Sequence, residues 1–469
     1  MQTLNRYFLR RATILYIVSL TVVLLVFFSN FMQWYWAAMG LLEVTLFYYL
    51  SSSWENTWSK SSEKSFEKTL FAVTAISRIA WILLYYLFTM AVWHTPWEQP
   101  IGTSMDSVGY YGEAMWLAEM IRQGDISPYL DYVNPSDAGY PVFLALLSLI
   151  IKDNILLTRL PNALFDAWTV ILTYRIAKRN FGEKNGRIAA IFTILMPQML
   201  FYAGVTMKES MMLMLTMWAL ERGDKAIRQK DSKVLSIIAF VLLSLIVSFF
   251  RTALAWVLVL AFICALVFSS DRIMKASRRW TIILTIALAG VTIFGGTIIE
   301  QTEDLLEQVD SEGQNFEYRA NRKGGNTLVS KMSKAVFAPI MFTLPFPTMV
   351  EIEGQNIQQL QNGGFYLKNI LSFFCVFALV LLLITKKWRG NVLIIAFLLG
   401  YLMVLALSSF AQSGRFHHPV IPMELIFATF GINNIKNRKQ ASWFDMFLAF
   451  EFVVIIAWNW FKLKGRGLM

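Results

Sequence analysis

Long apolar runs separated by short polar segments make up most of this chain. A helix needs about 20 apolar residues to cross a bilayer, and some 13 runs approach that length. They are 12–29, 31–50, 69–93, 155–177, 188–205, 207–221, 233–250, 252–270, 280–299, 366–385, 390–410, 416–432 and 442–461. The pattern predicts an all-α integral membrane protein with about 13 transmembrane helices, within a range of roughly 11 to 14.

Basic residues gather at alternate ends of these runs, so that successive clusters fall on one face of the membrane. By the positive-inside rule this face is cytoplasmic, as is the N-terminus. The clusters are Arg6, Arg10 and Arg11; Lys60, Lys64 and Lys68; Lys178, Arg179, Lys184 and Arg187; Arg222, Lys225, Arg228, Lys230 and Lys233; Arg272, Lys275, Arg278 and Arg279; Lys386, Lys387 and Arg389; and Lys436, Arg438 and Lys439. An odd number of spans leaves Lys462, Lys464 and Arg466 outside, so either the last run is interfacial or one span is miscounted.

Two longer segments, 94–138 and 300–365, are left on the outer side. The first carries seven acidic residues and one basic residue. The apolar stretch 140–151 is too short to cross, and crossing would reverse the sidedness of everything after it. It therefore predicts a juxtamembrane helix that begins near Pro141, a residue suited to the first turn of a helix.

The chain thus divides into five parts. They are N-terminal spans in 1–93, an acidic external loop with juxtamembrane helices in 94–152, central spans in 153–299, a second external loop in 300–365 and C-terminal spans in 366–469. Ordered external segments of this length are usually functional, so we expect the active region on the outer face.

The composition agrees with a membrane protein and argues against a soluble protein and a nucleic-acid-binding protein. Of 469 residues, 56% are hydrophobic and 16% are charged, and the mean hydropathy is +0.51, whereas a soluble domain carries about 25% charged residues. The net charge of +11 lies in short loops between apolar runs, which favours membrane topology over nucleic-acid binding. Cys264 and Cys375 both lie in apolar runs and give no disulfide framework.

The first external segment contains the most informative stretch, residues 104–117. On a helix, Asp106, Tyr110 and Glu113 would share one face at positions i, i+4 and i+7. A helix of this kind lies at the interface and presents a carboxylate to a cavity beside the bilayer. Asp106 is equally suited to be only the N-cap of the helix, and the spacing does not separate the two interpretations.

A second group consists of ionisable residues at the outer ends of the spans. Such groups are costly in a membrane and usually mark a site. The members are Lys208 and Glu209 after Gly204, Arg251 between two apolar runs, and Arg415, His417 and His418 at the mouth of the run at 416–432. The alternatives are snorkelling for Arg251 and a local ion pair between Lys208 and Glu209. The adjacent histidines lack the spacing of a metal site, so no cofactor is certain and a divalent metal stays open.

Five short motifs occur along the chain, and their order is more specific than any one of them alone. They are Met105-Asp106 followed by Tyr110 and Ala114, Gly139-Tyr140-Pro141, Arg159-Leu160-Pro161-Asn162, the turn from Gly204 to Lys208-Glu209, and Gly414-Arg415-Phe416 with Pro419 and Pro422. This order resembles the GT-C superfamily of membrane glycosyltransferases, in the branch of the protein O-mannosyltransferases and the lipid A aminoarabinose transferase.

The resemblance implies a sugar donor linked to a polyprenyl phosphate in the outer leaflet. The active site would face outside, and the membrane would be a bacterial inner membrane. The acceptor would be a glycan, lipid or protein, transfer would invert the anomeric carbon, and the other partners would be membrane lipids and no nucleic acid. Asp106 would be the catalytic base. The residues expected to bind substrates are Tyr110, Tyr111, Glu113, Tyr140, Lys208, Glu209, Arg251, Arg415, His417 and His418.

Two other functions stay open. A polymerase or ligase of O-antigen polysaccharides would also act on polyprenyl-linked sugars, and would use external residues such as Arg319, Arg322 and His417. A secondary transporter would place ionisable residues at mid-span. Here they gather at the outer ends, with Asp166 as the main exception, and no internal repeat is visible.

Overall fold

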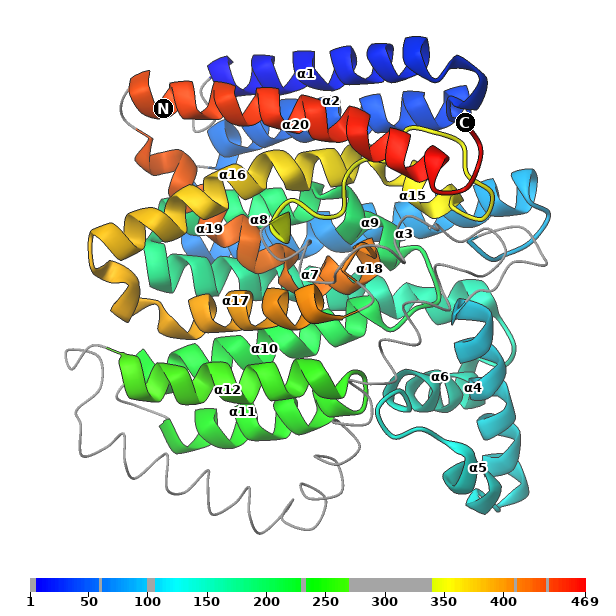
Figure 1. Ribbon diagram of the computed structural model, residues 1–469. Coiled ribbons are helices and arrows are strands. Elements are labelled where there is room, and N and C mark those ends of the chain that lie inside the picture. The colour runs from blue at the N-terminus through cyan, green and yellow to red at the C-terminus, as the bar shows by residue number, and fades with distance from the viewer. Residues whose placement is uncertain are drawn as a thin grey trace.

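The computed structural model describes residues 6–58, 61–98, 106–228, 233–269, 340–408, 411–435 and 438–469. Over these residues the chain is helical, apart from an isolated antiparallel bridge between Phe31 and Val350. Most of the helices lie side by side in one bundle (Figure 1). They are α1 (Arg6–Val26), α2 (Trp34–Trp58), α3 (Glu63–Val92), α7 (Ile155–Phe181), α8 (Glu183–Leu195), α10 (Glu209–Arg228), α11 (Lys233–Ser248), α12 (Thr252–Phe268), α16 (Asn362–Ile384), α17 (Val392–Leu407), α19 (Ile421–Asn434) and α20 (Arg438–Lys464).

Each apolar run predicted within the described residues overlaps helical structure, while the run at 280–299 and most of the loop at 300–365 lie outside them. Five helices are long and apolar enough to cross a membrane: Tyr7–Val26, Glu63–Val92, Ile155–Phe181, Asn362–Ile384 and Gln440–Lys464. A sixth span results if α8 and α9 (Pro197–Ala203), which meet at 54°, are counted together. The predicted number of about 13 is therefore not confirmed.

Several predicted runs form helices shorter than a full crossing. The apolar helices Val234–Ser248, Thr252–Phe268 and Val392–Leu407 fall below the roughly 20 residues that span the hydrocarbon core. The run at 416–432 is divided between α18 (Gly414–His417), a 3-10 turn (His418–Val420) and α19. Pro419 and Pro422 explain this division, because each removes a backbone donor from the helical ladder.

The bend between α8 and α9 is tied to two neighbouring helices by a buried ion pair. Arg78 of α3 donates from Nε to Asp166 of α7 (3.0 Å) and from Nη2 to the carbonyl oxygen of Ile194 (2.9 Å). Both charged side chains are buried, and Pro197 begins α9 just beyond the bend. Asp166, the one ionisable residue predicted at mid-span, is therefore neutralised by Arg78.

A small lobe of three helices lies at one end of the bundle (Figure 1). It contains α4 (Asp106–Gln123), α5 (Ser127–Tyr132) and α6 (Gly139–Ile151). The 13-residue α6 confirms the short helix predicted near Pro141, and it buries Tyr140 while Ile150 is 80% exposed. An exposed apolar side of this kind is typical of a helix at a membrane surface.

The chain termini lie at opposite ends of the bundle, and the C-terminus lies at the end that carries α4 (Figure 1). Here α20 is held by α15 (Asn356–Leu360) and the turn before it, because Lys462 Nζ donates to the side-chain oxygens of Gln355 (3.1 Å) and Gln358 (3.0 Å). Lys462 is buried, so this basic residue serves helix packing.

Candidate active site

A cavity of about 940 Å³ opens between α4 and the starts of α10, α12 and α18. Its walls contain both carboxylates and cationic side chains, together with several aromatic rings. The lining residues are Asp106, Gly109, Tyr110, Gly112, Glu113, Trp116, Tyr132, Ser136, Asp137, Lys208, Phe250, Arg251, Thr252, Ala253, Arg415 and Phe416.

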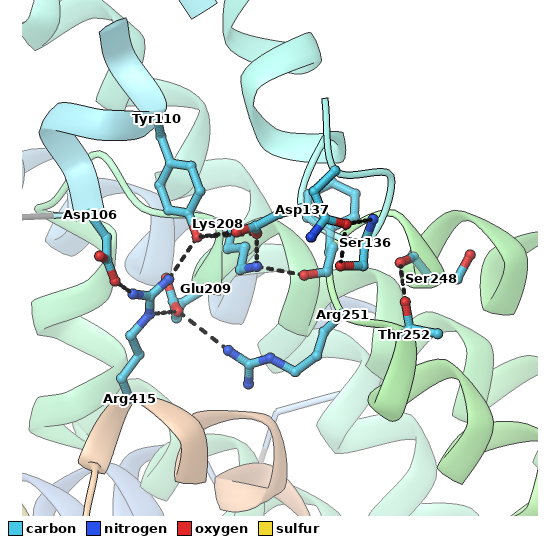
Figure 2. Close-up of polar contacts among 12 residues, drawn as sticks. Asp106, Tyr110, Ser136, Asp137, Lys208, Glu209, Ser248, Arg251, Thr252 and Arg415 are labelled. Carbon is cyan, nitrogen blue, oxygen red and sulfur yellow. Dashed lines mark hydrogen bonds and ion pairs between the residues drawn. The ribbon is translucent and has the colours of Figure 1, made fainter. Parts of the chain in front are cut away.

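Arg415 lies at the centre of the polar contacts in this cavity (Figure 2). Its Nη1 is paired with the carboxylate of Asp106, its Nε is paired with Glu209, and its Nη2 donates to the hydroxyl of Tyr110 (3.0 Å). The side chain of Glu209 is fully buried, whereas that of Asp106 is 60% exposed. Burial lowers the pKa of Arg415 to about 10, so the guanidinium stays charged at neutral pH.

A second arginine lies on the other side of Glu209. Arg251 directly precedes α12, donates from Nη1 to the hydroxyl of Tyr401 (2.9 Å) and places Nη2 4.0 Å from Glu209 Oε1. Its guanidinium stacks on the ring of Phe416 at 4.3 Å. The buried carboxylate of Glu209 therefore offsets the repulsion between two guanidinium groups held close together.

Lys208 forms the third cationic group of the cavity. Its ammonium is paired with Asp137 and donates to the carbonyl oxygen of Phe250 (2.6 Å). Tyr110 also donates to Asp137 (3.2 Å). Burial lowers the pKa of Lys208, and Asp137 opposes that effect, while burial followed by the nearby carboxylates raises the pKa of Tyr110 and keeps its hydroxyl protonated. The salt bridge of Lys208 thus goes to Asp137, where the sequence left a pair with Glu209 open.

Asp137 is the site residue that sequence reasoning missed. It was one of seven acids in the external loop, with no periodic relation to Asp106. One feature of the sequence could have identified it: Asp137 lies two residues before the helix that begins at Gly139-Tyr140-Pro141. The start of that helix fixes the position of the backbone at Asp137. The structure brings it to Lys208, 71 positions further along the chain.

The structure brings most of the predicted site residues together. Those that line the cavity are Asp106, Tyr110, Glu113, Lys208, Arg251 and Arg415. Glu209 lies directly behind Arg415, and the buried ring of Tyr140 contacts the ring of Tyr110 edge to face at 5.8 Å. Asp106 is the first residue of α4, and its carboxylate is engaged by Arg415, which the N-cap interpretation does not require.

Five predicted residues lie outside the cavity lining: Glu209 and Tyr140, which contact residues of the lining, and Tyr111, His417 and His418. Tyr111 points to another side of α4, where its hydroxyl is paired with Asp153. His417 and His418 are both buried; a ring nitrogen of His417 lies 2.8 Å from the carbonyl oxygen of Ala411, and His418 packs against the ring of Tyr202 at 4.6 Å. The turn of α18 therefore directs Arg415 into the cavity and the histidines into the bundle.

The described residues contain no group of three or more His, Cys, Asp or Glu side chains arranged to hold a metal ion. The cavity carboxylates are paired with other groups: Asp106 with Arg415, Asp137 with Lys208, and Glu113 with the hydroxyl of Tyr129 (2.9 Å).

The first turns of α7 fix the loop that presents Lys208 and Glu209. Arg159 is buried and donates from Nε to Thr206 Oγ1 (3.0 Å) and from Nη2 to the carbonyl oxygen of Pro96 (2.5 Å). One turn further on, Asn162 donates to the carbonyl oxygen of Val205 (3.1 Å). The Arg-Leu-Pro-Asn motif thus has a structural role next to the cavity.

The contact with Pro96 carries this support to the opposite wall. Two residues after Pro96, the buried carboxylate of Glu98 accepts a hydrogen bond from Ser107 (2.6 Å), the neighbour of Asp106 on α4. Arg159 therefore connects the wall that carries Asp106 with the wall that carries Lys208.

Comparison with known proteins agrees with the chemistry of the cavity. Residues 128–300 match the model of the Alg9-like mannosyltransferase family, a family with the GT-C fold. The matched segment includes Lys208 and Arg251, and leaves out Asp106 and Arg415. No curated protein matches the chain. The match and the apolar helices together support a membrane glycosyltransferase of the GT-C type, and they do not single out the O-mannosyltransferase branch.

We expect Arg159→Lys to lower the turnover number for sugar transfer roughly tenfold or more, because an ammonium does not reproduce the fixed geometry in which Nε and Nη2 reach Thr206 and Pro96, and small misplacements of catalytic groups are costly. Transfer rates and thermal unfolding midpoints of purified variants measure the effect. Arg78→Lys is the matched control, since Arg78 is equally buried and lies outside the cavity lining. Equal losses of turnover in both variants would mean that Arg159 contributes only to general stability.

Proposed function

We propose that this protein transfers a sugar from a polyprenyl-phosphate donor to an acceptor hydroxyl or amine on the outer face of the membrane. The supporting observation is the cluster of Asp106, Arg415 and Arg251 in one cavity at the end of a bundle of apolar helices. A base beside paired guanidinium groups suits an acceptor that loses a proton and a leaving group that is a phosphate. The similarity to Alg9-like mannosyltransferases points to the same class of donor.

In the proposed reaction the acceptor oxygen or nitrogen forms a bond to the anomeric carbon of the donor sugar. Its proton passes to the carboxylate of Asp106. The bond between the anomeric carbon and the phosphate oxygen breaks, and its electron pair leaves with the polyprenyl phosphate. Arg415 and Arg251 stabilise the negative charge that develops on this leaving group, and Arg is suited to bidentate contact with phosphate.

A single displacement from the face opposite the phosphate inverts the anomeric carbon. Asp106 is the best candidate for the base because its carboxylate is 60% exposed to the cavity. Asp137 is paired with Lys208 and is less exposed, at 48%, and Glu209 is buried between two arginines. The assignment of one base and no nucleophilic carboxylate favours inversion over retention.

The first test concerns the side of the membrane on which the cavity opens. In a background with Cys264→Ala and Cys375→Ala, we expect a cysteine introduced at Asp125 to react with an impermeant maleimide on intact cells. A cysteine at Lys184, at the opposite, basic end of α7 and α8, should react only after the membrane is opened. The reverse labelling would move the proposed reaction to the cytoplasmic face.

Asp106→Asn tests the base. The variant keeps the shape of the side chain, and we expect transfer to fall at least roughly a hundredfold because the proton acceptor is lost. The measurement is transfer of labelled sugar from a synthetic polyprenyl-phosphate monosaccharide by purified protein in detergent, with the unfolding midpoint as control. Near-normal transfer by a folded variant would leave Asp106 with a structural role at the start of α4.

Arg415→Lys tests the phosphate site in the same assay. The lysine keeps the charge but cannot reproduce the three contacts to Asp106, Glu209 and Tyr110, so we expect a loss of roughly a hundredfold. Transfer at the wild-type rate would remove Arg415 from the phosphate site and leave Arg251. Activity of the wild type with a monosaccharide donor also counts against a polymerase, which requires an oligosaccharide on a lipid pyrophosphate.

A further inference from the structure

The base proposed above is already engaged in the structure without substrate. Asp106 is paired with Nη1 of Arg415 (Figure 2). A nearby cation favours the charged form of a carboxylate, so a carboxylate held in this way accepts a proton less readily than a free one. For Asp106 to act, the pair has to open first.

The three contacts of Arg415 differ in how easily they can be exchanged. The contact of Nε with Glu209 is buried on both sides, and removing one partner of a buried ion pair is strongly destabilising. The contact of Nη1 is different, because Asp106 is 60% exposed and is resolvated when it leaves. Glu209 thus anchors the guanidinium while its Nη1 edge remains free to change partner.

The surroundings of that edge suit a phosphate group. Arg251 lies on the other side of Glu209 and stacks on Phe416, whose ring also lies 6.0 Å from the guanidinium of Arg415. Both arginines line the same cavity. A phosphate between them would accept charge-assisted hydrogen bonds from two guanidinium groups, whereas Asp106 is bound by Arg415 alone. The phosphate would therefore be held more strongly than the carboxylate that it replaces.

We infer that the donor phosphate displaces Asp106 from Arg415, so that donor binding itself releases the catalytic base, with Glu209 as the residue that positions Arg415 for the exchange. The inference rests on the proposed function and adds an order to it. The donor binds before the acceptor is deprotonated, and without donor the base stays masked. No covalent bond changes in this step; one ion pair is replaced by another.

The exchange has a testable consequence, because Asp106 and the phosphate compete for one guanidinium. Asp106→Asn should bind a fluorescent polyprenyl monophosphate roughly fivefold more tightly than the wild type, although it cannot transfer sugar. Glu119→Gln is the control: it removes the same charge from the same helix, outside the cavity lining, and Glu119, like Asp106, is paired with an arginine, Arg122. Its affinity for the probe should stay within about twofold of the wild type.

The second arm places Asp106→Asn and Asp106→Ala each in an Arg415→Gln background. There the gain in affinity for the probe should disappear. Inorganic phosphate is used as a competitor of the lipid probe. If the variant gains affinity for the lipid probe and not for inorganic phosphate, the group that replaces Asp106 is the phosphate of the lipid donor. Asp106→Ala provides a second variant, and unfolding midpoints establish that each protein is folded.

The inference is overturned if Asp106→Asn binds the probe no more tightly than the wild type, if Glu119→Gln gains equally, or if the gain persists without Arg415. These outcomes are separate from the test of the base. An inactive Asp106→Asn with wild-type affinity rejects the exchange and keeps the base, whereas an active variant with increased affinity rejects the base and keeps the exchange.

Discussion

The cavity depends on one ion-pair arrangement, in which Arg415 is shared between Asp106 of the three-helix lobe and Glu209 at the start of α10. A buried carboxylate is unfavourable unless it is paired, and α18 turns Arg415 toward Glu209, where it makes the closer of the two arginine contacts of that carboxylate. The same guanidinium reaches α4 through Asp106 and Tyr110. The bundle and the lobe are therefore joined at the point where the reaction is proposed to occur.

This arrangement has a counterpart on the other side of the cavity. Arg159 connects the segment before α4 with the loop before α10 through uncharged acceptors, and Arg415 connects the same two elements through charges. The side chain of Arg159 is buried, and its acceptors are neutral oxygens that a bound anion would not replace. The charged contacts include an exposed partner, Asp106. The walls of the cavity thus have one permanent connection and one that a bound anion can alter.

Local patterns predicted the helices and part of the site. The spacing of Asp106, Tyr110 and Glu113 depends only on helical periodicity, and all three side chains line the cavity. The short helix near Pro141 followed from length and from the first-turn preference of proline. Arg415 was singled out by its place among the ionisable residues at the ends of the apolar runs and then by the family resemblance, and the structure gives it three partners in the cavity.

Contacts between distant parts of the chain were beyond that reasoning. The pairing of Lys208 with Asp137 and the burial of His417 are set by how helices pack, and neighbouring residues in a tight turn point in different directions. The predicted number of about 13 spans is not confirmed, because several apolar runs within the described residues form helices too short to cross or are divided by prolines.

The sequence positions of the cavity residues also constrain biosynthesis. Helices of a membrane protein are made from the N-terminus onward, and Asp106 and Glu209 are synthesised long before Arg415. Until residue 415 has been synthesised, the nascent protein contains both carboxylates and lacks the guanidinium that they share. Completion of the binding cavity is thereby delayed until α18 has been made, and a chain truncated before α18 would contain the proposed base without the group that is paired with it.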